Sequence, residues 1–219
     1  MAKEPVVISK NPKIYYVDEM LSEDECKHII EVASPHMKIA GVSVMPGQKG
    51  FEKGVYKGRT NRSAWLEKDM SPQIFEICQR IADQLGCNRD HFESLQVIHY
   101  EPGQEYKYHY DAYDFRATEK YKRFCGKRGN RLRTVLVYMN HVEEGGETGF
   151  NQAKPLGEVI KVTPQTGRMI VFDNLLEDGS LNRRSRHAGL PVIKGEKWAF
   201  NLWLRERPAL NSVQPMTPA

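Results

Sequence analysis

Apolar residues recur at helical spacing in two stretches of the first ninety residues. Ser22 and Glu25 have the spacing of a capping box, so we expect a helix that begins after Ser22 and ends before Pro35. A second helix is expected between Ser71, as its N-cap, and Gly86, which suits the position just after the last helical residue. Its apolar stripe consists of Ile74, Ile77, Cys78, Ile81, Ala82 and Leu85. We interpret both helices as supports that cover one face of a sheet.

From residue 94 onward the hydrophobic period shortens from about 3.6 residues to 2, which is typical of β-strands. Strands are expected at residues 95–100, 105–111, 134–140, 158–162, 167–172 and in the long segment 187–205, with a further strand at 14–17. Turns are expected at 101–104 and 143–147. This many short strands favours a β-sandwich or barrel, and the N-terminal helices make the fold class α+β, mainly β.

Two stretches lack either period and are predicted to be loops. Residues 39–60 contain five glycines, and residues 114–133 contain eight lysines and arginines. The basic stretch is either a solvated face or a lid that attracts an acidic partner or covers a site. We expect a single domain over residues 1–207, with helical support at 18–90 and a β core at 94–207, followed by a flexible tail at 208–219.

Composition narrows the setting of the protein. The chain is 40% hydrophobic and 27% charged, which is ordinary for a globular protein, and its formal net charge of +4 is too small to imply nucleic acid by itself. No secretory signal or membrane-spanning apolar run is visible. The four cysteines form no Cys-x-x-Cys pair. We therefore expect a cytoplasmic or otherwise intracellular protein with reduced thiols and no membrane partner.

The chemistry begins with His109-Tyr110-Asp111. Residues i and i+2 of a strand point to the same face, so this imidazole and this carboxylate are expected to reach one point in space. With one more imidazole they would complete the two-His-one-carboxylate triad that binds non-haem Fe(II) and leaves coordination positions open.

Seven histidines compete for the remaining position, and His187 is the strongest candidate. It opens the last long β segment and precedes a hairpin that carries a lysine. The others lie where surface or strand-edge positions are more common: His28, His36, His91, His99 and His141.

Lys197 begins a strand with two distinct faces. Trp198, Phe200, Leu202 and Leu204 form an apolar face, whereas Lys197, Ala199, Asn201, Trp203 and Arg205 form a face that could line a cavity. Either the Lys197 ammonium lies in water or it is turned into the barrel, where an anion must compensate its charge. A 2-oxo dicarboxylate would supply that anion while chelating Fe(II), with O2 in the last coordination position. Tyr100 and Thr134, on neighbouring strands, offer hydroxyls to the same carboxylate.

These motifs together resemble the Fe(II)/2-oxoglutarate dioxygenases of the prolyl 4-hydroxylase family. The likeness rests on His109-x-Asp111, a distal His187 and Lys197 ten residues further on. It extends to residues 95–111, 131–140, 142–148 and 194–198, and it covers roughly residues 14–207. The resemblance implies a double-stranded β-helix, or distorted jelly roll, with supporting N-terminal helices.

The resemblance also implies a function and roles for residues. The expected reaction is hydroxylation of prolyl residues in a peptide or protein, with succinate and CO2 as co-products and ascorbate as a candidate reductant. His109, Asp111 and His187 correspond to the iron ligands, and Lys197 corresponds to the partner of the distal 2-oxoglutarate carboxylate, assisted by Tyr100 and Thr134.

The family's substrate groove corresponds to a further set of positions. They are Arg59, Ser63, Tyr106, Arg131 and Trp203, with Glu93 a weaker match. The chain departs from the family at Arg205, where peptide-binding relatives often carry a histidine, and at residues 41–58, which are longer than the usual loop. Both departures concern the substrate rather than the chemistry.

Two alternatives remain open at this point. The same chemistry could act on nucleic acid, with the basic stretch contacting phosphates, or on a different amino-acid side chain. Arg183, Arg184 and Arg186 add to the positive field of the basic stretch. Alternatively, the chain could be a non-enzymatic jelly-roll module that keeps a metal for structure.

Overall fold

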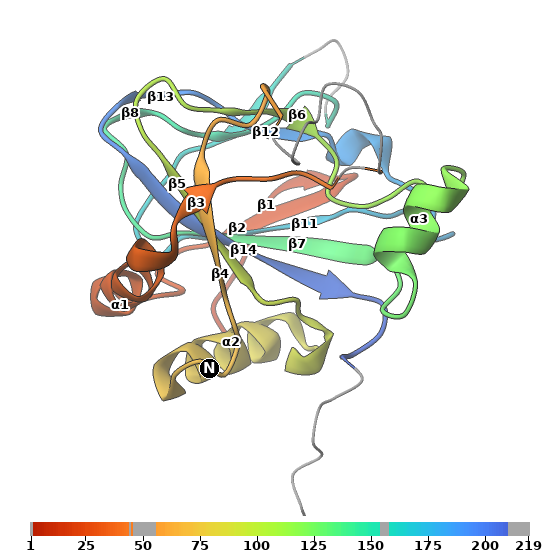
Figure 1. Ribbon diagram of the computed structural model, residues 1–219, viewed down its shortest axis with the longest axis horizontal. Coiled ribbons are helices and arrows are strands. Elements are labelled where there is room, and N and C mark those ends of the chain that lie inside the picture. The colour runs from red at the N-terminus through yellow and green to blue at the C-terminus, as the bar shows by residue number, and fades with distance from the viewer. Residues whose placement is uncertain (1, 44, 46–55, 154–157, 210–219) are drawn as a thin grey trace, which may run out of the picture.

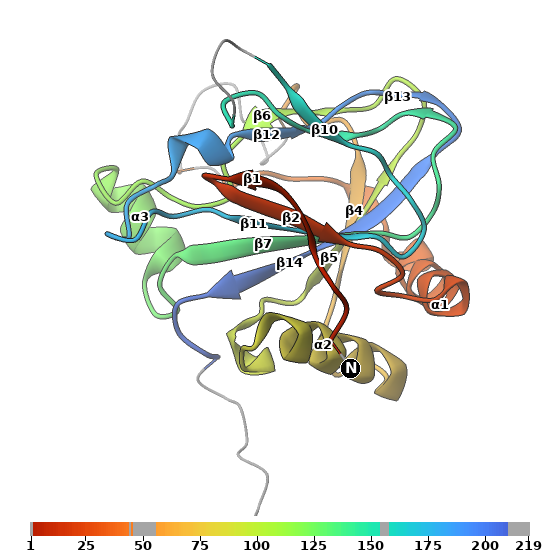
Figure 2. The same cartoon turned by 180° about the vertical axis from the view of Figure 1, so that it is seen from behind.

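The fold consists of antiparallel sheets that face each other, with two helices on the outer side of the larger sheet (Figures 1 and 2). The structure is a computed structural model and describes residues 2–43, 45, 56–153 and 158–209. In spatial order the large sheet contains β1 (Val6–Lys10), β2 (Lys13–Val17), β11 (Met169–Asp173), β7 (Arg131–Tyr138), β14 (Lys197–Arg205), β5 (Leu95–Tyr100), β4 (Arg62–Leu66) and β3 (Lys38–Ile39).

The smaller sheet covers the inner face of the large one. Its strands are, in spatial order, β10 (Ile160–Val162), β9 (Thr148–Phe150), β12 (His187–Gly189) and β6 (Tyr106–His109). A two-stranded ribbon, β13 (Val192–Lys194) with β8 (Glu144–Gly145), is continuous along the chain with its two central strands, β12 and β9. This arrangement matches the predicted mainly-β, α+β jelly-roll class.

Alternation along the central strands separates two hydrophobic cores. On β7, Val135 and Val137 point to the helix side, whereas Leu136 and Tyr138 point between the two sheets. On β14 the predicted apolar face packs with the helix-side core, so the opposite face is free to line a cavity.

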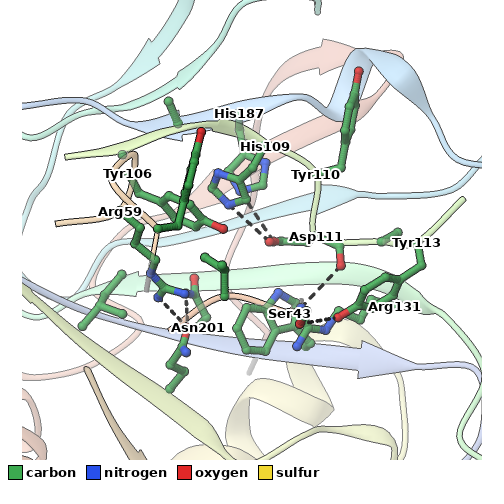
Figure 3. Close-up of a pocket in the computed structure, with 18 of the residues that line it drawn as sticks. Ser43, Arg59, Tyr106, His109, Tyr110, Asp111, Tyr113, Arg131, His187 and Asn201 are labelled. Carbon is green, nitrogen blue, oxygen red and sulfur yellow. Dashed lines mark hydrogen bonds and ion pairs between the residues drawn. The ribbon is translucent and has the colours of Figure 1, made fainter. Parts of the chain in front are cut away.

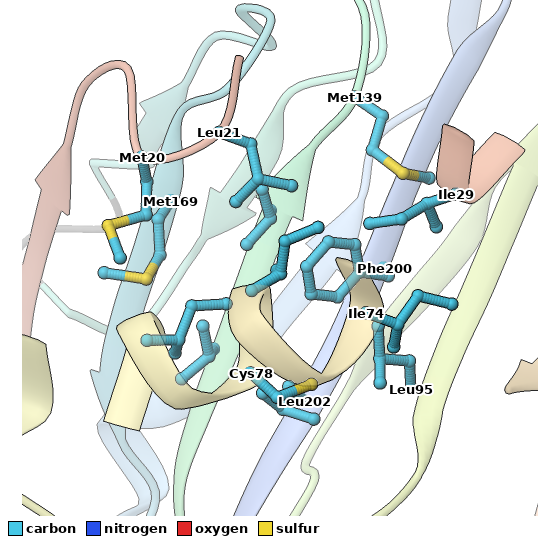
Figure 4. Close-up of a cluster of buried hydrophobic side chains, with 14 of the residues drawn as sticks. Met20, Leu21, Ile29, Ile74, Cys78, Leu95, Met139, Met169, Phe200 and Leu202 are labelled. Atoms are coloured by element: carbon cyan, nitrogen blue, oxygen red, sulfur yellow. The ribbon is translucent and has the colours of Figure 1, made fainter. Parts of the chain in front are cut away.

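The two predicted helices are confirmed with their predicted caps. α1 (Glu23–Ala33) begins with the complete Ser22–Glu25 capping box, and α2 (Pro72–Leu85) begins at the Ser71 cap. Gly86 ends α2 with a φ of 64°, a left-handed conformation that favours glycine. Figure 4 shows Ile74 and Cys78 of α2 packed against Phe200 and Leu202 of the large sheet. No helix in the described ranges is both long and apolar enough to cross a membrane.

Three elements differ from the predictions. The basic stretch contains a helix, α3 (Thr118–Cys125), so helices are not confined to the N-terminal half. The strand expected at 105–111 ends at His109. β3 and β4 were not predicted as strands, and they form because β4 pairs along its whole length with β5. α3 is held by the stacking of Phe124 on Tyr113, which lies just before the helix, and by burial of Cys125.

Within the described ranges, the remaining regular elements are three short 3-10 turns, η1 (Ser34–His36), η3 (Arg89–His91) and η5 (Arg183–Ser185). Much of the predicted loop 39–60, namely residues 44 and 46–55, lies outside the described residues, as do residues 210–219 of the predicted tail.

The contact between α2 and the sheet leads to a first prediction. Ile77 is fully buried in the helix-side core, so Ile77→Ala should lower the free energy of unfolding by about 2–5 kcal/mol. Urea denaturation followed by circular dichroism measures the change. Glu76→Ala, at the exposed neighbouring position of the same helix, is the matched control and should stay within about 0.5 kcal/mol of wild type. A similar loss in both variants would contradict the packing described here.

Candidate active site

The pairing of β12 with β6 brings two histidines together. His187 lies directly opposite His109 in the antiparallel register, so both rings project from the same face of the small sheet. Asp111 lies in a bend beyond the end of β6, and its carboxylate turns back toward both rings (Figure 3). Its Oδ1 is 3.5 Å from Nε2 of His109, and its Oδ2 is 3.5 Å from Nε2 of His187. The three ligand atoms lie within 4.8 Å of one another, a spacing that one metal ion could bridge.

The hydrogen bonds of the two imidazoles decide which ring nitrogen can bind a metal. Nδ1 of His109 is 2.8 Å from the carbonyl oxygen of Lys107, and Nδ1 of His187 is 3.0 Å from that of Ser185. A carbonyl only accepts, so each Nδ1 carries the hydrogen and each Nε2 directs a lone pair toward the carboxylate. Lone pairs and a carboxylate that converge in this way repel one another unless a cation lies between them. The donor set therefore fits a divalent metal.

Burial sets the charge of these ligands. Burial lowers the pKa of His187 to about 4, so this ring is neutral at pH 7, the form that binds metal. Burial also disfavours the Asp111 carboxylate, but the positive charge of His187 and His109 in their protonated forms, together with Arg131, holds its pKa well below its usual value. The aspartate is therefore ionised.

Thr134 orients Asp111 from the facing sheet. Its Oγ1 donates a 2.6 Å hydrogen bond to Asp111 Oδ2 and accepts one of 2.9 Å from Nδ2 of Asn174, which is fully buried. Thr134 thus lies at Asp111 and not beside Lys197, which does not support the expected contact with an anion at Lys197. Tyr138, which lies beside Lys197, is four residues along β7 from Thr134, a distance of about 13 Å on a strand.

Lys197 is buried in the cavity. Of the two predicted alternatives, an ammonium in water or an ammonium turned into the barrel, the structure has the second. Only 1% of the residue is exposed, and Nζ lies 5.2 Å from the ring centroids of both Tyr100 and Tyr138. Burial lowers its pKa to about 7, opposed by the more distant Glu147. Across the described parts of the chain, no carboxylate lies within 4 Å of Nζ. A bound anionic ligand would offset the free-energy cost of burying the Lys197 ammonium without a carboxylate partner.

Thr148, rather than Thr134, lies close to Lys197. It lines the cavity, and its Oγ1 is 2.7 Å from the hydroxyl of Tyr138, whose ring flanks Lys197. The turn before it contains Gly145 and Gly146 with φ of 79° and 70°, and Gly146 packs near the Lys197 side chain. The Gly-Gly-Glu-Thr sequence at this turn was the available signal for Thr148.

One cavity of about 770 Å³ contains the histidines, Asp111 and Lys197. All five predicted substrate residues also line it: Arg59, Ser63, Tyr106, Arg131 and Trp203. Sequence reasoning missed several others, including Trp65, which lies 5.9 Å from Trp203 between ring centroids. β14 spans the cavity, with Lys197 near one end and Trp203 six residues away near the other.

Arg59 is held by neutral partners. Its guanidinium donates to the side chains of Asn61 and Gln96 at 3.0 and 3.1 Å and to the carbonyl of Gly41 at 2.8 Å. It also lies over the ring of Tyr106, 4.6 Å from the centroid. The pair forms a rigid wall of the cavity.

Arg131 is held by a charged partner behind the cavity. It makes two hydrogen bonds of 2.7 and 2.9 Å to Glu93 and stacks 3.6 Å from the ring centroid of Trp203. Glu93 also pairs with Arg205 Nε at 2.6 Å. Neither Glu93, the weaker match to the substrate groove, nor Arg205, the departure from the family, lines the cavity, and Glu93 pairs with both Arg131 and Arg205.

The described part of the predicted long loop does reach the cavity. Gly41, Val42, Ser43 and Tyr56 line it, and Ser43 Oγ is 2.8 Å from the hydroxyl of Tyr113 on the opposite wall. The rest of residues 41–58 lies outside the described residues.

Comparisons with known proteins agree with this geometry. Residues 95–205 match the 2OG-Fe(II) oxygenase superfamily. The chain is 36% identical to probable prolyl 4-hydroxylase 10 of Arabidopsis thaliana over 213 residues, covering 91% of this chain and 71% of the relative. It is 34% identical to probable prolyl 4-hydroxylase 3 of the same plant, covering 90% of this chain and 71% of the relative.

A solved structure has a similar fold. It is a viral collagen prolyl hydroxylase from Paramecium bursaria Chlorella virus-1 in complex with 2OG. The TM-score is 0.66 at 29% identity, covering 90% of this chain and 98% of that one.

The two buried threonines allow a test of the metal site. Thr134→Val removes the donor to Asp111 and should weaken binding of Mn(II) about 10–100-fold, measured by calorimetry without oxygen. Thr148→Val makes the same change at a threonine bonded to Tyr138, and its metal affinity should equal that of wild type. Equal losses in the two variants would show that Thr134 has no specific part in orienting Asp111.

Proposed function

The chain belongs to the 2OG-Fe(II) oxygenase superfamily, and we propose that it hydroxylates prolyl residues of a peptide or protein substrate. It is a 2-oxoglutarate-dependent oxygenase similar to prolyl 4-hydroxylases over most of its length. The observation that carries the proposal is the meeting of a metal-binding triad and a buried, uncompensated lysine in one cavity.

In this proposal His109, Asp111 and His187 hold Fe(II). Their neutral imidazoles and single carboxylate bind three positions and leave three open. Bound Fe(II) and 2-oxoglutarate supply the oxidation, in which one atom of O2 enters the substrate and the other enters succinate as CO2 leaves. The protein's part is to hold these groups in a fixed arrangement and to keep Asp111 ionised.

Lys197 is proposed to bind the distal carboxylate of 2-oxoglutarate. Its ammonium has no carboxylate partner within 4 Å in the described ranges, so a ligand carboxylate would offset its cost of burial. Tyr100 and Thr148 line the same end of the cavity and offer hydroxyls to that carboxylate.

The other end of the cavity is proposed to hold the substrate. Tyr106, held between Arg59 and the stacked His109 ring, and Trp203, held by Arg131, line this part of the cavity and offer a preformed apolar surface to a pyrrolidine ring. Ser63 adds a hydroxyl on the same wall. The relatives' names support a proline-containing substrate over nucleic acid, and membership of the superfamily supports an enzyme over a binding module.

The direct test is turnover. Purified protein incubated with Fe(II), 2-oxoglutarate, ascorbate and a panel of proline-rich peptides should add one oxygen atom to a peptide and release succinate. Mass spectrometry detects both products, and His109→Ala should abolish them while keeping the fold. Absence of succinate and of any oxidised peptide across the whole panel would disprove the proposed activity.

Replacement of Lys197 separates co-substrate binding from metal binding. Lys197→Ala should raise the Kd of 2-oxoglutarate by about 30-fold or more, because it removes one partner of a buried charge pair. Its affinity for Mn(II) should stay within about threefold of wild type. An equal loss of both ligands would indicate a folding defect and contradict the assignment.

The lowered pKa of Lys197 adds a pH dependence. The ligand binds the protonated amine, so in wild type its affinity should decrease as the pH rises above about 7, by up to about tenfold per unit. Calorimetry between pH 6 and 8.5 measures the slope. Lys197→Arg cannot lose its charge in this range and should show a flat profile.

A further inference from the structure

The face of α3 that borders the active-site cavity carries only positive charge. Lys120, Arg123 and Phe124 line the cavity, at helical spacings that put them on one side of the helix. Glu119 lies on the outer side, where it pairs with Lys122 at 3.4 Å. The acidic residue of α3 is thus directed to solvent and two cations are directed to the cavity.

α3 is anchored, so these cations occupy a defined place. Phe124 stacks on Tyr113 with ring centroids 5.2 Å apart and planes at 11°. The side chain of Asn130 accepts a 3.0 Å hydrogen bond from the backbone N–H of Tyr113 and donates one of 2.8 Å to its carbonyl. Asn130 directly precedes Arg131, which stacks on Trp203. The cations therefore lie toward the Trp203 end of the cavity, away from Lys197.

The carboxylates that line the cavity do not neutralise Lys120 and Arg123. Among its described lining residues only Asp111 and Asp114 are acidic. Asp111 faces the two histidines, and Asp114 pairs with Arg183 at 3.4 Å. No carboxylate of the described chain lies within 4 Å of the Lys120 or Arg123 side-chain nitrogens.

The metal site and its co-substrate do not neutralise Lys120 and Arg123 either. With both ligands bound, the two charges of Fe(II) and the ammonium of Lys197 are balanced by Asp111 and the two carboxylates of 2-oxoglutarate. The cations of α3 are additional to that balance, so they remain available to a substrate.

A second cavity extends the positive surface. It measures about 350 Å³ and shares Asp114 and Leu181 with the first. Arg116, Arg183 and Arg184 line it, and Asp114 is its sole acidic residue among those described. A chain that leaves the active site in this direction meets basic side chains on both sides of Asp114.

We propose that the substrate of this enzyme carries an aspartate or glutamate close to the hydroxylated proline, and that Lys120 and Arg123 bind its carboxylate. This inference rests on the proposed prolyl hydroxylation and adds a charge requirement to its substrate. The two cations act as specificity-determining residues, since they contact a flanking residue and not the reacting carbon.

The test uses peptides that differ in one charge. In a peptide that the wild-type enzyme hydroxylates, each position from three before to three after the proline is replaced by Glu, Gln or Lys. At one or two positions Glu should lower KM about three- to tenfold relative to Gln, and Lys should raise it, with kcat nearly unchanged. The advantage of Glu should shrink as NaCl is raised from 50 to 500 mM.

Two variants of α3 serve as a matched pair. Lys120→Glu should abolish the preference for Glu and favour the Lys peptide, whereas Lys122→Glu makes the same charge change on the outer face and should keep the wild-type order. Lys122→Glu should hydroxylate the Gln peptide with a kcat and KM close to those of wild type. An equal effect of the two variants would overturn the inference, because a general field would then explain the preference.

The outcomes also separate this inference from the proposed function. Hydroxylation of Glu, Gln and Lys peptides with equal KM would overturn the inference and leave the prolyl hydroxylase activity intact. No oxidised peptide or succinate with any of them would overturn the proposed function itself. Competition by a single-stranded oligonucleotide that is lost in Lys120→Glu but kept in Lys122→Glu would assign the cations to phosphates and overturn the inference.

Discussion

The antiparallel register of β6 and β12 is the constraint on which the site depends. It puts His187 directly opposite His109, so their Nε2 atoms converge with the Asp111 carboxylate. A slip of one residue would turn one imidazole to the other face of the sheet and dissolve the triad. β12 is also paired on its other side with β9, and the His187 ring packs against Phe172 of the large sheet. The register is thus held from both edges and from the facing layer.

The large sheet faces the two histidines and gives the cavity two distinct ends. Alternation on β7 and β14 sends one set of side chains into the core under α2 and the other toward the small sheet. Lys197 and Tyr138 face one end, and Thr134 and Trp203, paired across the two strands, face the other. Because a strand holds such residues at a fixed spacing, a co-substrate anchor and a substrate wall can be kept apart on one rigid element.

Charged groups around the cavity differ in their burial and in their partners. Two of the buried charged groups have partners within the protein: Asp111 accepts a hydrogen bond from Thr134, and Arg131 pairs with Glu93. Lys197 has a lowered pKa, and its proposed partner is the bound co-substrate. At the mouth, Lys120 and Arg123 keep their charges in partial contact with solvent. Strong interactions therefore fix the reacting groups, while weaker and salt-sensitive ones are left to select the substrate.

Features that depend on neighbouring residues were predictable from the sequence alone. Both helix caps, the exact span of β5 and the two faces of β14 follow from capping chemistry and hydrophobic period. The His-x-Asp pair with a distal His187 was predictable from the metal-ligand residue types and the family resemblance. Only the tertiary structure decided which threonine meets Asp111, that Glu93 pairs with both Arg131 and Arg205, and that a basic loop folds as α3. The contacts of Asp111 and of Glu93 join segments about 20 to 115 residues apart, and no local period records which of two similar side chains a distant strand will face.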